Sequence, residues 1–346
     1  MSSISSQPIG STRRSGSERG AVVFHERDEL LAEVASLYYE AGLDQAAIAE
    51  RIGVSRSNIS RMLSEARRKG LVEIRIVRPL PTDDALAREA VERFGLRDAL
   101  VLDARKVRES DVLPRVGALA ARYVETLLAH GDVLAISWGT ALRSVAEAFA
   151  PQRKLAVEVV QMIGGAGSRY PDIDGAELAR RFAERLGGRY RYLHAPLLVD
   201  SPATCQALLQ EPSIRDVLDR AAQAKVAVVG IGSVEPSISA PLRAGYTTTE
   251  ELAALQRLGV VGDVCGRHFD IHGRLPDIEL NRRVIGLDGQ ALRRIPYVVG
   301  VAAGRLKGRA ILGSLRSRLV NVLITDSDTL GEVLRLEARH RDPADP

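Results

Sequence analysis

The stretch "GLDQAAIAERIGVSRSNISRMLSEARRKGLVEIRIV", residues 42–77, decides the fold of the first part of the chain. Apolar residues recur at helical spacing on both sides of a Gly-Val-Ser corner. Asp44 and Ser55 can each cap the helix that follows, and Gly53 supplies the turn between the helices. Residues 71–77 then alternate apolar and charged residues, which indicates a half-exposed strand. This order predicts a helix-turn-helix followed by the wing of a winged helix.

The polar face of the second helix predicts DNA contacts. Arginine pairs with the edge of guanine, asparagine with adenine and serine with either, whereas basic residues one or two turns later suit phosphates. The predicted core of this unit is Ala47, Ile48, Ile52, Val54, Ile59 and Leu63. The predicted DNA-binding residues are Gln45, Ser55, Arg56, Ser57, Asn58, Ser60, Arg61, Arg67, Arg68 and Lys69. The alternative is a helical bundle with a solvated basic face.

Charge is concentrated in this part of the chain. The 346 residues carry a net charge of only +4, yet residues 51–80 hold eight basic and two acidic groups. A local excess of positive charge is typical of a protein of which one part meets phosphate. Double-stranded operator DNA is therefore the predicted partner.

Composition indicates a soluble globular chain in a reducing cytoplasm. No apolar run reaches the length of a membrane span, so no membrane partner is expected. Residues 1–24, rich in Ser, Gly and Arg, read as a disordered tail, although such a composition also suits a transit peptide. The two cysteines, Cys205 and Cys265, have no metal-ligand spacing. We expect a bacterial cytoplasmic protein, associated with the nucleoid when bound to DNA, without a cofactor.

A domain boundary is predicted at "RPLPT", residues 78–82, because its prolines cannot continue a helix or a central strand. Residues 25–80 then form the DNA-binding domain, with an amphipathic first helix over 26–40, and residues 81–346 an effector and oligomerisation domain. Apolar runs separated by helical stretches follow, at 133–139, 157–165, 226–232, 297–304 and 320–326. Such alternation predicts an α/β fold in which a parallel sheet lies in three layers with helices on both faces.

Glycines and small hydroxyl residues follow several of these predicted strands. Ligands of open α/β sheets bind outside the carboxyl ends of the strands, where small residues let backbone N–H groups approach an anion. The predicted effector-binding residues at such positions are Ser137, Trp138, Gly139, Thr140, Gly164, Gly165 and Gly232. Asp263 and Asp270 could accept sugar hydroxyls, and Lys307 could meet a phosphate. Turn caps and a solvated helix face are the simpler interpretations of these three residues.

Two histidines and a cysteine leave a further alternative open. His268, Asp270 and His272 could be taken for a metal site, and with Cys265 for a metal- or redox-sensing repressor. Surface or hydrogen-bonding roles are commoner for such residues, so no metal ligand is predicted.

Both parts of the chain resemble the SorC family of bacterial sugar-responsive transcriptional regulators, also loosely called DeoR-like. The resemblance rests on "QAAIAERIGVSRSNISRMLSEARRKGLVEIRI", "ISWGTALRSVAEAF", "VVQMIGG", "HAPLLVDS", "VVGIGSVEPS", "LGVVGDVCGRHFDIHGR", "GRLKGRAILGSLR" and "VNVLITDSDTL". It implies an effector domain related to the sugar-phosphate isomerase fold, a tetramer built as a dimer of dimers, and DNA affinity set by a phosphorylated sugar or a polyol. By matching motif it implies as ligand groups Ser137, Gly139, Thr140, Gly232, Asp263, Asp270 and Lys307. Ala141 and Ile163 stand where the family often carries polar side chains, which keeps a neutral polyol as an alternative.

The predicted function is that of a DNA-binding transcriptional regulator of a carbohydrate catabolic operon. A sugar, polyol or sugar phosphate bound in the second domain would control operator affinity, with repression as the expected mode. The alternative is a sugar-phosphate isomerase-like enzyme with an accessory DNA-binding module. An isomerase needs a general base beside the substrate carbon, and no acid–base pair with a convincing position stands out. No catalytic residue is therefore predicted.

Overall fold

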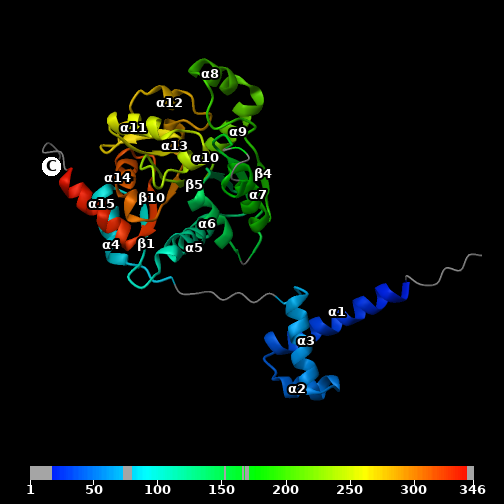
Figure 1. The fold of residues 1–346 in the computed structure, drawn as a ribbon. Helices are drawn as coiled ribbons and strands as arrows, with labels where there is room; N and C mark the ends of the chain where they lie inside the picture. The colour runs from blue at the N-terminus through cyan, green and yellow to red at the C-terminus, as the bar shows by residue number, and fades with distance from the viewer. Residues whose placement is uncertain (1–17, 73–79, 152, 166, 168–170, 341–346) are drawn as a thin grey trace, which may run out of the picture. The chain divides into compact units, whose positions relative to one another are not determined.

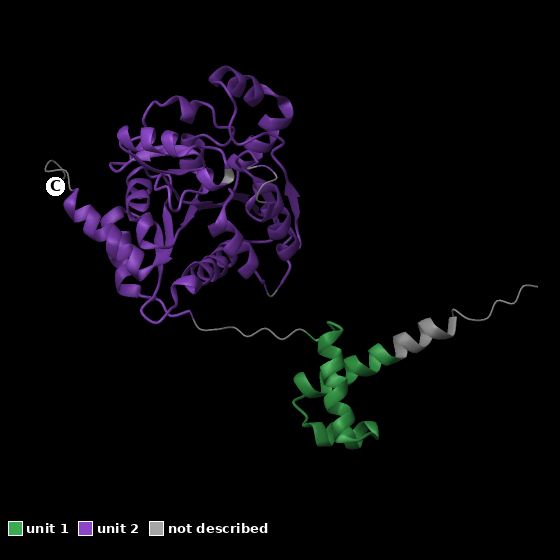
Figure 2. Ribbon diagram, in the orientation of Figure 1, with its two compact units in different colours: residues 1–79 green, residues 80–346 purple. Residues whose placement is uncertain are grey.

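The computed structural model describes residues 18–72, 80–151, 153–165, 167 and 171–340. The chain divides into two compact units, residues 1–79 and residues 80–346, shown in different colours in Figure 2. This division falls within the "RPLPT" segment. Among the helices of the described residues, none combines the length and the apolar composition that a membrane span requires.

The first unit holds three helices in its described part: α1 (Glu18–Tyr39), α2 (Gln45–Ile52) and α3 (Arg56–Arg68). Their shared core consists of Leu31, Val34, Ala35, Ile48, Ala49, Ile59, Met62, Leu63 and Ala66. Helix α1 begins earlier than the sequence predicts, so residues 18–24 of the predicted tail are helical. Ala47, predicted in the core, is exposed, and Ala49 is buried on α2 instead. Most of the predicted wing, from residue 73 on, lies outside the described residues.

The corner between α2 and α3 forms through the capping residues that the sequence indicates. Asp44 accepts hydrogen bonds from the Ala46 and Ala47 amides at the start of α2. Gly53 ends that helix with a φ of 76°, which lies in the left-handed region that a residue with a side chain seldom adopts. Ser55 then accepts a hydrogen bond from the Asn58 amide and starts α3. Two helices are thus joined by three residues, a local arrangement that short-range sequence signals can specify.

The second unit is built on a seven-stranded sheet in the order β1-β10-β9-β5-β2-β3-β4, with every neighbouring pair parallel. Its strands are β1 (Asp98–Leu102), β2 (Val133–Ile136), β3 (Glu158–Gln161), β4 (Arg189–Arg191), β5 (Val226–Gly230), β9 (Tyr297–Val301) and β10 (Val322–Asp326). The predicted parallel α/β sheet is therefore confirmed. The two edge strands of this sheet, β1 and β4, were not predicted from the sequence.

Both faces of the sheet are buried, because alternate residues of a strand point to opposite sides. Leu134 and Ile136 of β2 belong to one hydrophobic cluster, whereas Val133 and Ala135 belong to the other. The first cluster packs under α5 (Glu109–Leu127), α6 (Thr140–Ala148) and α7 (Gly175–Leu186). The second packs under α4 (Asp84–Phe94), α9 (Pro212–Ala222), α13 (Gly289–Arg294), α14 (Gly308–Arg316) and α15 (Ser327–Arg339). Figure 1 shows helices on both sides of the sheet.

Shorter elements complete the unit along the carboxyl ends of the strands. They include a small antiparallel sheet of β6 (Gly232–Ser233), β7 (Val260–Val264) and β8 (Arg267–Asp270). The remaining helices are η1 (Pro171–Ile173), α8 (Pro202–Gln210), α10 (Ala240–Ala244), α11 (Thr249–Arg257), α12 (Glu279–Arg282) and η2 (Arg305–Lys307). The direction in which successive strands are added to the sheet changes between β2 and β5. The strands β3 and β4 continue the sheet beyond β2, whereas β9 and β10 continue it beyond β5. Such a switch point is where open α/β sheets bind ligands.

Candidate functional site

A cavity of about 360 Å³ opens at the carboxyl ends of β2, β5 and β9, beside the switch point; we call it the basic cavity. Its lining comes from the segments that follow these three strands, from α10, from the β7–β8 hairpin and from η2. Its lining includes Ser137, Trp138, Gly139, Thr140, Arg143, Gly232, Pro241, Arg243, Asp263, Cys265 and Lys307. Seven of the predicted effector residues are therefore brought together in one place.

Helix α6 begins at this cavity without a side-chain cap. Gly139 precedes the helix with a φ of 113°, and its amide donates a hydrogen bond to the Ile173 carbonyl at 2.9 Å. The N–H groups of the first helical turn have no partner within the helix, and together with the helix dipole they attract anions. Thr140 and Ala141 of this turn line the cavity. The start of α6 can thus receive a negatively charged group.

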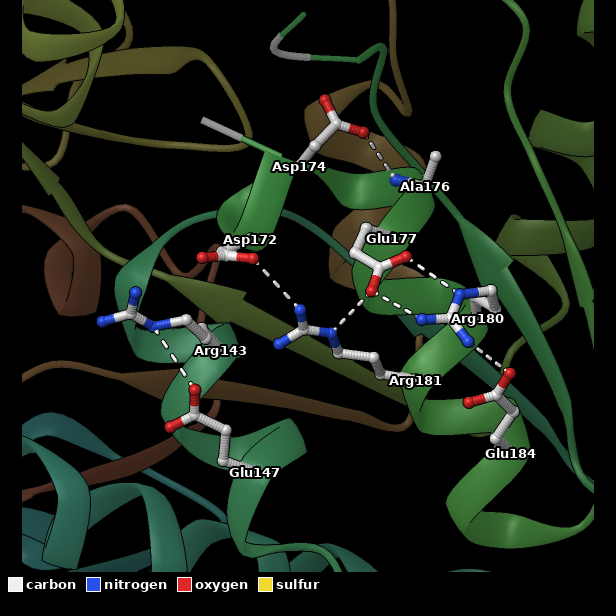
Figure 3. Close-up of polar contacts among 9 residues, drawn as sticks. All are labelled: Arg143, Glu147, Asp172, Asp174, Ala176, Glu177, Arg180, Arg181 and Glu184. Atoms are coloured by element: carbon white, nitrogen blue, oxygen red, sulfur yellow. Dashed lines mark hydrogen bonds and ion pairs between the residues drawn. The ribbon is translucent and has the colours of Figure 1, made fainter. Parts of the chain in front are cut away.

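Ion pairs on the neighbouring helix hold the segment that orients the start of α6. Arg181 of α7 contacts Asp172 of η1 at 3.2 Å and Glu177 at 2.7 Å, as Figure 3 shows. Ile173, the next residue of η1, supplies the carbonyl that accepts the Gly139 amide. The sharp turn before α6 is thereby tied to the body of α7.

Three basic side chains and one carboxylate line the basic cavity. Arg143 and Arg243, which the sequence analysis did not single out, join Lys307 and Asp263 there. The Arg143 Nε is buried without a hydrogen-bond partner in the described part of the chain. It lies 3.7 Å from Glu147 Oε1, beyond hydrogen-bond distance (Figure 3). The excess of basic side chains beside an uncapped helix start favours an anionic ligand.

Lys307 is held in the cavity by a backbone carbonyl. Its Nζ donates to the Ile231 carbonyl at 2.7 Å, and Ile231 follows directly after β5. Burial lowers the pKa of Lys307 to about 8, although the Asp263 carboxylate acts to raise it. The ammonium group is therefore poorly hydrated, and it can strengthen its interactions by pairing with an incoming anion.

Asp263 faces the cavity from β7, opposite Gly232 of β6 in the small antiparallel sheet. Its Oδ2 accepts a hydrogen bond from the Gly266 amide at 3.0 Å, which fixes the carboxylate at the β7–β8 turn. Ionised carboxylates accept hydrogen bonds only, so Asp263 can receive ligand hydroxyl groups. One side of the cavity can thus hold an anion and another a hydroxyl.

Helix α3 in the first unit exposes its polar residues on the side opposite the core. Arg56, Asn58 and Ser60 are exposed, as is Arg67. Helical periodicity places four other exposed residues furthest from the core, namely Ser57, Arg61, Ser64 and Arg68. Ser64 was missed by the sequence analysis although it lies at the spacing of Ser57 and Arg61. The exposed side of α3 is therefore polar and basic along its length.

Three other residues predicted to contact DNA have ion-pair partners within the first unit or lie at the start of a helix. They are Lys69, Ser55 and Gln45. Lys69 pairs with Asp28 of α1 at 2.6 Å and with Glu65 at 3.7 Å. Ser55 is used as the cap of α3, and Gln45 is half-buried as the first residue of α2. The ion pairs of Lys69 join α1 to α3, which gives this side chain a structural role that the predicted phosphate contact did not include.

Comparison with known proteins identifies the family. Residues 80–335 match the family model described as "Putative sugar-binding domain". The deoxyribonucleoside regulator of Bacillus subtilis is 33% identical over 304 residues, covering 88% of this chain and 96% of that protein. The chain belongs to the SorC family of transcriptional regulators. The sorbitol operon regulator of Klebsiella pneumoniae is 33% identical over 309 residues, which cover 88% of this chain and 98% of the relative.

Solved structures of the SorC family share the fold. The crystal structure of the full-length sorbitol operon regulator from Klebsiella pneumoniae has a TM-score of 0.66 at 31% identity. The match covers 89% of this chain and 99% of that one. The relatives that match the chain are transcriptional regulators, so this SorC family member is a transcriptional regulator and not an enzyme.

Two predicted glycines of this SorC family member lie away from the basic cavity lining. A β-carbon on Gly164 would lie 2.2 Å from the Pro196 carbonyl oxygen, so this glycine permits two backbone segments to pack together. Gly165 donates its amide to the Ala195 carbonyl and forms a bridge with Pro196. Their strand-end position resembles that of Gly139, but the chain at 195–196 occupies the space that a ligand would need.

Asp270 also lies away from the basic cavity. It accepts hydrogen bonds from the His272 and Arg274 amides and so caps the turn after β8. Asp263 and Asp270 sit at opposite ends of the β7–β8 hairpin, because Asp263 pairs with His268 near its turn. Only Asp263 therefore reaches the cavity.

The two histidines and the cysteine in and beside this hairpin have different surroundings. His268 is buried and bonded to Asn281, whereas His272 is exposed. Cys265 is buried at the basic cavity, where burial raises the pKa of its thiol to about 12. Across the residues that the structure describes, no three His, Cys, Asp or Glu side chains gather as a metal site would need.

Proposed function

We propose that this SorC family member binds operator DNA through α3 and binds a phosphorylated sugar in the basic cavity, and that the sugar phosphate changes its operator affinity. One observation carries the effector half of the proposal. Three basic side chains, Arg143, Arg243 and Lys307, converge with the uncapped start of α6 on a cavity at the switch point of the sheet. Asp263 offsets one of these charges and Arg143 also pairs with Glu147, so a neutral polyol would leave the rest of the positive charge unmatched.

The effector residues take distinct roles in this proposal. Ser137, Gly139 and Thr140 present small groups and backbone N–H donors to the phosphate, and Lys307 pairs with it. Asp263 accepts sugar hydroxyls, with Gly232 leaving it room, while Trp138 forms a wall. The names of two relatives, a sorbitol operon regulator and a deoxyribonucleoside regulator, support a carbohydrate-related effector and a catabolic operon.

The DNA half of the proposal rests on α2 and α3 as a helix-turn-helix. We infer that α3 enters the major groove as the recognition helix of a winged helix-turn-helix. Arg56, Ser57, Asn58, Ser60 and Arg61 would meet base edges, and Arg67 and Arg68 the phosphates. The exposed polar side of α3 and the caps at Asp44 and Ser55 support this assignment.

In this proposal, assembly into an oligomer connects effector binding with DNA binding. We infer a homotetramer, a dimer of dimers whose paired first units bind half-sites about one helical turn or a multiple of it apart. The effector unit is inferred to share the sugar-phosphate isomerase fold and to act in repression. Ligand binding would favour one arrangement of the effector units and so alter operator affinity, a coupling typically of about 1–3 kcal/mol.

A ligand screen tests the proposal. Intrinsic fluorescence is well suited, because Trp138 is the only tryptophan in the chain and lines the basic cavity. The full chain is titrated with sugars, polyols and their phosphates, and each ligand that binds is added to a DNA-binding assay. We expect sugar phosphates to bind and at least one of them to shift DNA affinity. Tight binding of neutral polyols alone would contradict the anionic effector.

A further inference from the structure

A second cavity adjoins the basic cavity and differs from it in character; we call it the apolar cavity. Trp138, Pro241 and Asp263 line both, so the two cavities lie side by side. Leu197, Leu252, Leu255 and Val284 are among the side chains that make its walls apolar. Its volume of about 50 Å³ has room for only a few non-hydrogen atoms, since one water needs about 10–15 Å³ by the same measure.

Five of the polar side chains that line the apolar cavity already make a hydrogen bond within the protein. They are Ser233 with the Glu235 amide, Ser239 with the Leu242 amide, Tyr246 with the Gly165 carbonyl, Thr247 with Glu251 and Asp263 with the Gly266 amide. His268 is bonded to Asn281 through one ring nitrogen, and its other ring nitrogen remains open. Recognition of a ligand group here therefore depends on which ring nitrogen of His268 carries the hydrogen.

The hydrogen-bond network around Asn281 fixes that choice. The Asn281 Nδ2 donates to the His268 and Pro276 carbonyls at 3.3 and 3.1 Å. The Asn281 Oδ1 accepts the His268 backbone amide at 2.9 Å, so the side-chain amide has only one orientation that satisfies all three groups. That same oxygen lies 3.0 Å from His268 Nδ1, which must therefore carry the hydrogen. In the neutral ring, Nε2 is left as an acceptor with no partner among the described residues.

We propose that the apolar cavity is a compartment of the effector site that takes a small apolar group of the ligand, and that His268 Nε2 accepts a hydrogen bond from one hydroxyl beside that group. This inference rests on the proposed function, because it assumes that a sugar phosphate occupies the basic cavity. The ligand class is a sugar phosphate with a methyl or other deoxygenated end. A hydroxyl in place of that methyl would be desolvated among leucine and valine side chains.

Matched ligand pairs test the compartment. Hexose 1-phosphates in the galactose and mannose configurations are compared with their 6-deoxy counterparts by Trp138 fluorescence of the full chain. We expect the 6-deoxy member to bind at least about tenfold tighter in one or both pairs. Equal or weaker binding of the 6-deoxy member in both pairs would overturn the inference while leaving the proposed function standing. If no sugar phosphate bound, the proposed function itself would fail, and this inference with it.

Variants test the role of His268. His268→Phe keeps an aromatic ring but removes Nε2, and we expect it to weaken binding of the 6-deoxy member at least fivefold, because the hydroxyl beside the methyl group loses its acceptor. His268→Gln, which keeps an acceptor, should recover part of this affinity. His272→Phe, on the exposed turn after β8, is the matched control and should keep the full affinity. An affinity for the 6-deoxy member that is unchanged in His268→Phe would overturn the assignment, as would an equal loss in His268→Gln, which indicates structural damage alone.

Nitrogen-15 spectroscopy of histidine-labelled protein gives an independent measurement. The His268 signals should show the hydrogen on Nδ1, and the Nε2 signal should shift when the 6-deoxy ligand is added. A hydrogen on Nε2 in the free protein would contradict the network around Asn281 and overturn the acceptor role.

Discussion

A β-carbon on Gly232 would lie 1.8 Å from the Asp263 Oδ1, so the carboxylate occupies the space that any other residue at 232 would need. The two residues face each other in the pairing of β6 with β7. The Asp263 carboxylate can therefore keep its position at the basic cavity only because residue 232 has no side chain.

Gly232→Ala should displace the Asp263 carboxylate and weaken effector binding at least about tenfold. Overpacking of a close contact should also lower the free energy of unfolding by about 1–3 kcal/mol. Trp138 fluorescence titration and urea denaturation measure the two effects. Gly331→Ala is the control, because a β-carbon at Gly331 in α15 meets nothing within 4 Å and alanine favours a helix. Effector affinity in Gly232→Ala equal to that of the wild type would contradict the role of this pair.

Substitutions on α3 should separate base reading from phosphate contact. Alanine at Arg56, Asn58 or Arg61 should each weaken specific DNA binding by about 1–3 kcal/mol and relax sequence preference. Alanine at Arg67 should instead weaken binding to all sequences and reduce the salt dependence by about one unit of slope. Fluorescence anisotropy with specific and random duplexes at several salt concentrations distinguishes these outcomes.

Lys69→Ala provides the matched control for α3. This lysine follows directly after Arg67 and Arg68 but is held by Asp28 and Glu65. We expect its loss to affect DNA affinity less than the loss of Arg67. If Lys69→Ala weakened DNA binding as much as Arg67→Ala, the ion pairs would not define the role of this residue.

The local features of the first unit could be predicted from the sequence because each depends on neighbours in the chain. Asp44, Gly53 and Ser55 act within a few residues of their own positions, and the structure places them as caps and corner. The strands that were missed are edge strands. β4, for example, consists of three residues, "RYR", of which two are exposed, so no apolar run reveals it.

The basic cavity was harder to predict because it depends on which strand ends meet. Arg143 and Arg243 lie on helices and not at strand ends, and only the fold brings them to the same cavity as Lys307. Gly164 has the same sequence context as other strand-end glycines, yet the chain near Pro196 packs against it. Asp270 follows Asp263 by seven residues, but an antiparallel hairpin places the two at opposite ends.

The pH dependence of effector binding should follow Lys307. Its pKa is lowered from an ordinary value near 10.5 to about 8, so the ammonium group loses its proton as pH rises through 8. Affinity for a sugar phosphate should then fall by up to about tenfold per pH unit above 8. Lys307→Arg keeps its charge and should flatten this dependence. Affinity that stays constant from pH 7 to 9.5 in the wild type would contradict a phosphate contact.

The contribution of Lys307 to the free energy of unfolding should change with pH in the direction opposite to its contribution to effector affinity. Between pH 8 and about 10.5, the unfolded chain holds the Lys307 proton more tightly than the folded chain does. Unfolding therefore takes up a proton, and the contribution of Lys307 to the free energy of unfolding rises with pH across this window. Comparison of the wild type with Lys307→Met by urea denaturation at pH 7.5 and 9.5 measures it. A contribution that falls with pH would show that the folded-state pKa is not lowered.

Glu158 should contribute stability that is lost in acid. Burial acts to raise the pKa of Glu158, but hydrogen bonds from Arg191, Arg189 and Arg220 outweigh it and lower the pKa to about 2. The contribution is full above about pH 4.5 and is lost as pH falls toward 2. Glu158→Gln should lower the free energy of unfolding by about 1–3 kcal/mol at pH 7 and by less at pH 3.

Glu184→Gln is the control for this cluster. Glu184 pairs with Arg180 on the exposed side of α7, as Figure 3 shows, and a surface pair of this kind contributes little. Urea denaturation of both variants at pH 7 and pH 3 makes the comparison. A deficit in Glu158→Gln that is the same at both pH values would contradict the lowered pKa.

The most direct test is the affinity of the full chain for its operator duplex, measured with and without a saturating sugar phosphate that binds the basic cavity. We predict a change of at least about fivefold in Kd, in line with a coupling of about 1–3 kcal/mol, and its loss in Lys307→Met. An operator Kd that stays the same when the cavity is saturated would contradict the claim that this site controls DNA binding.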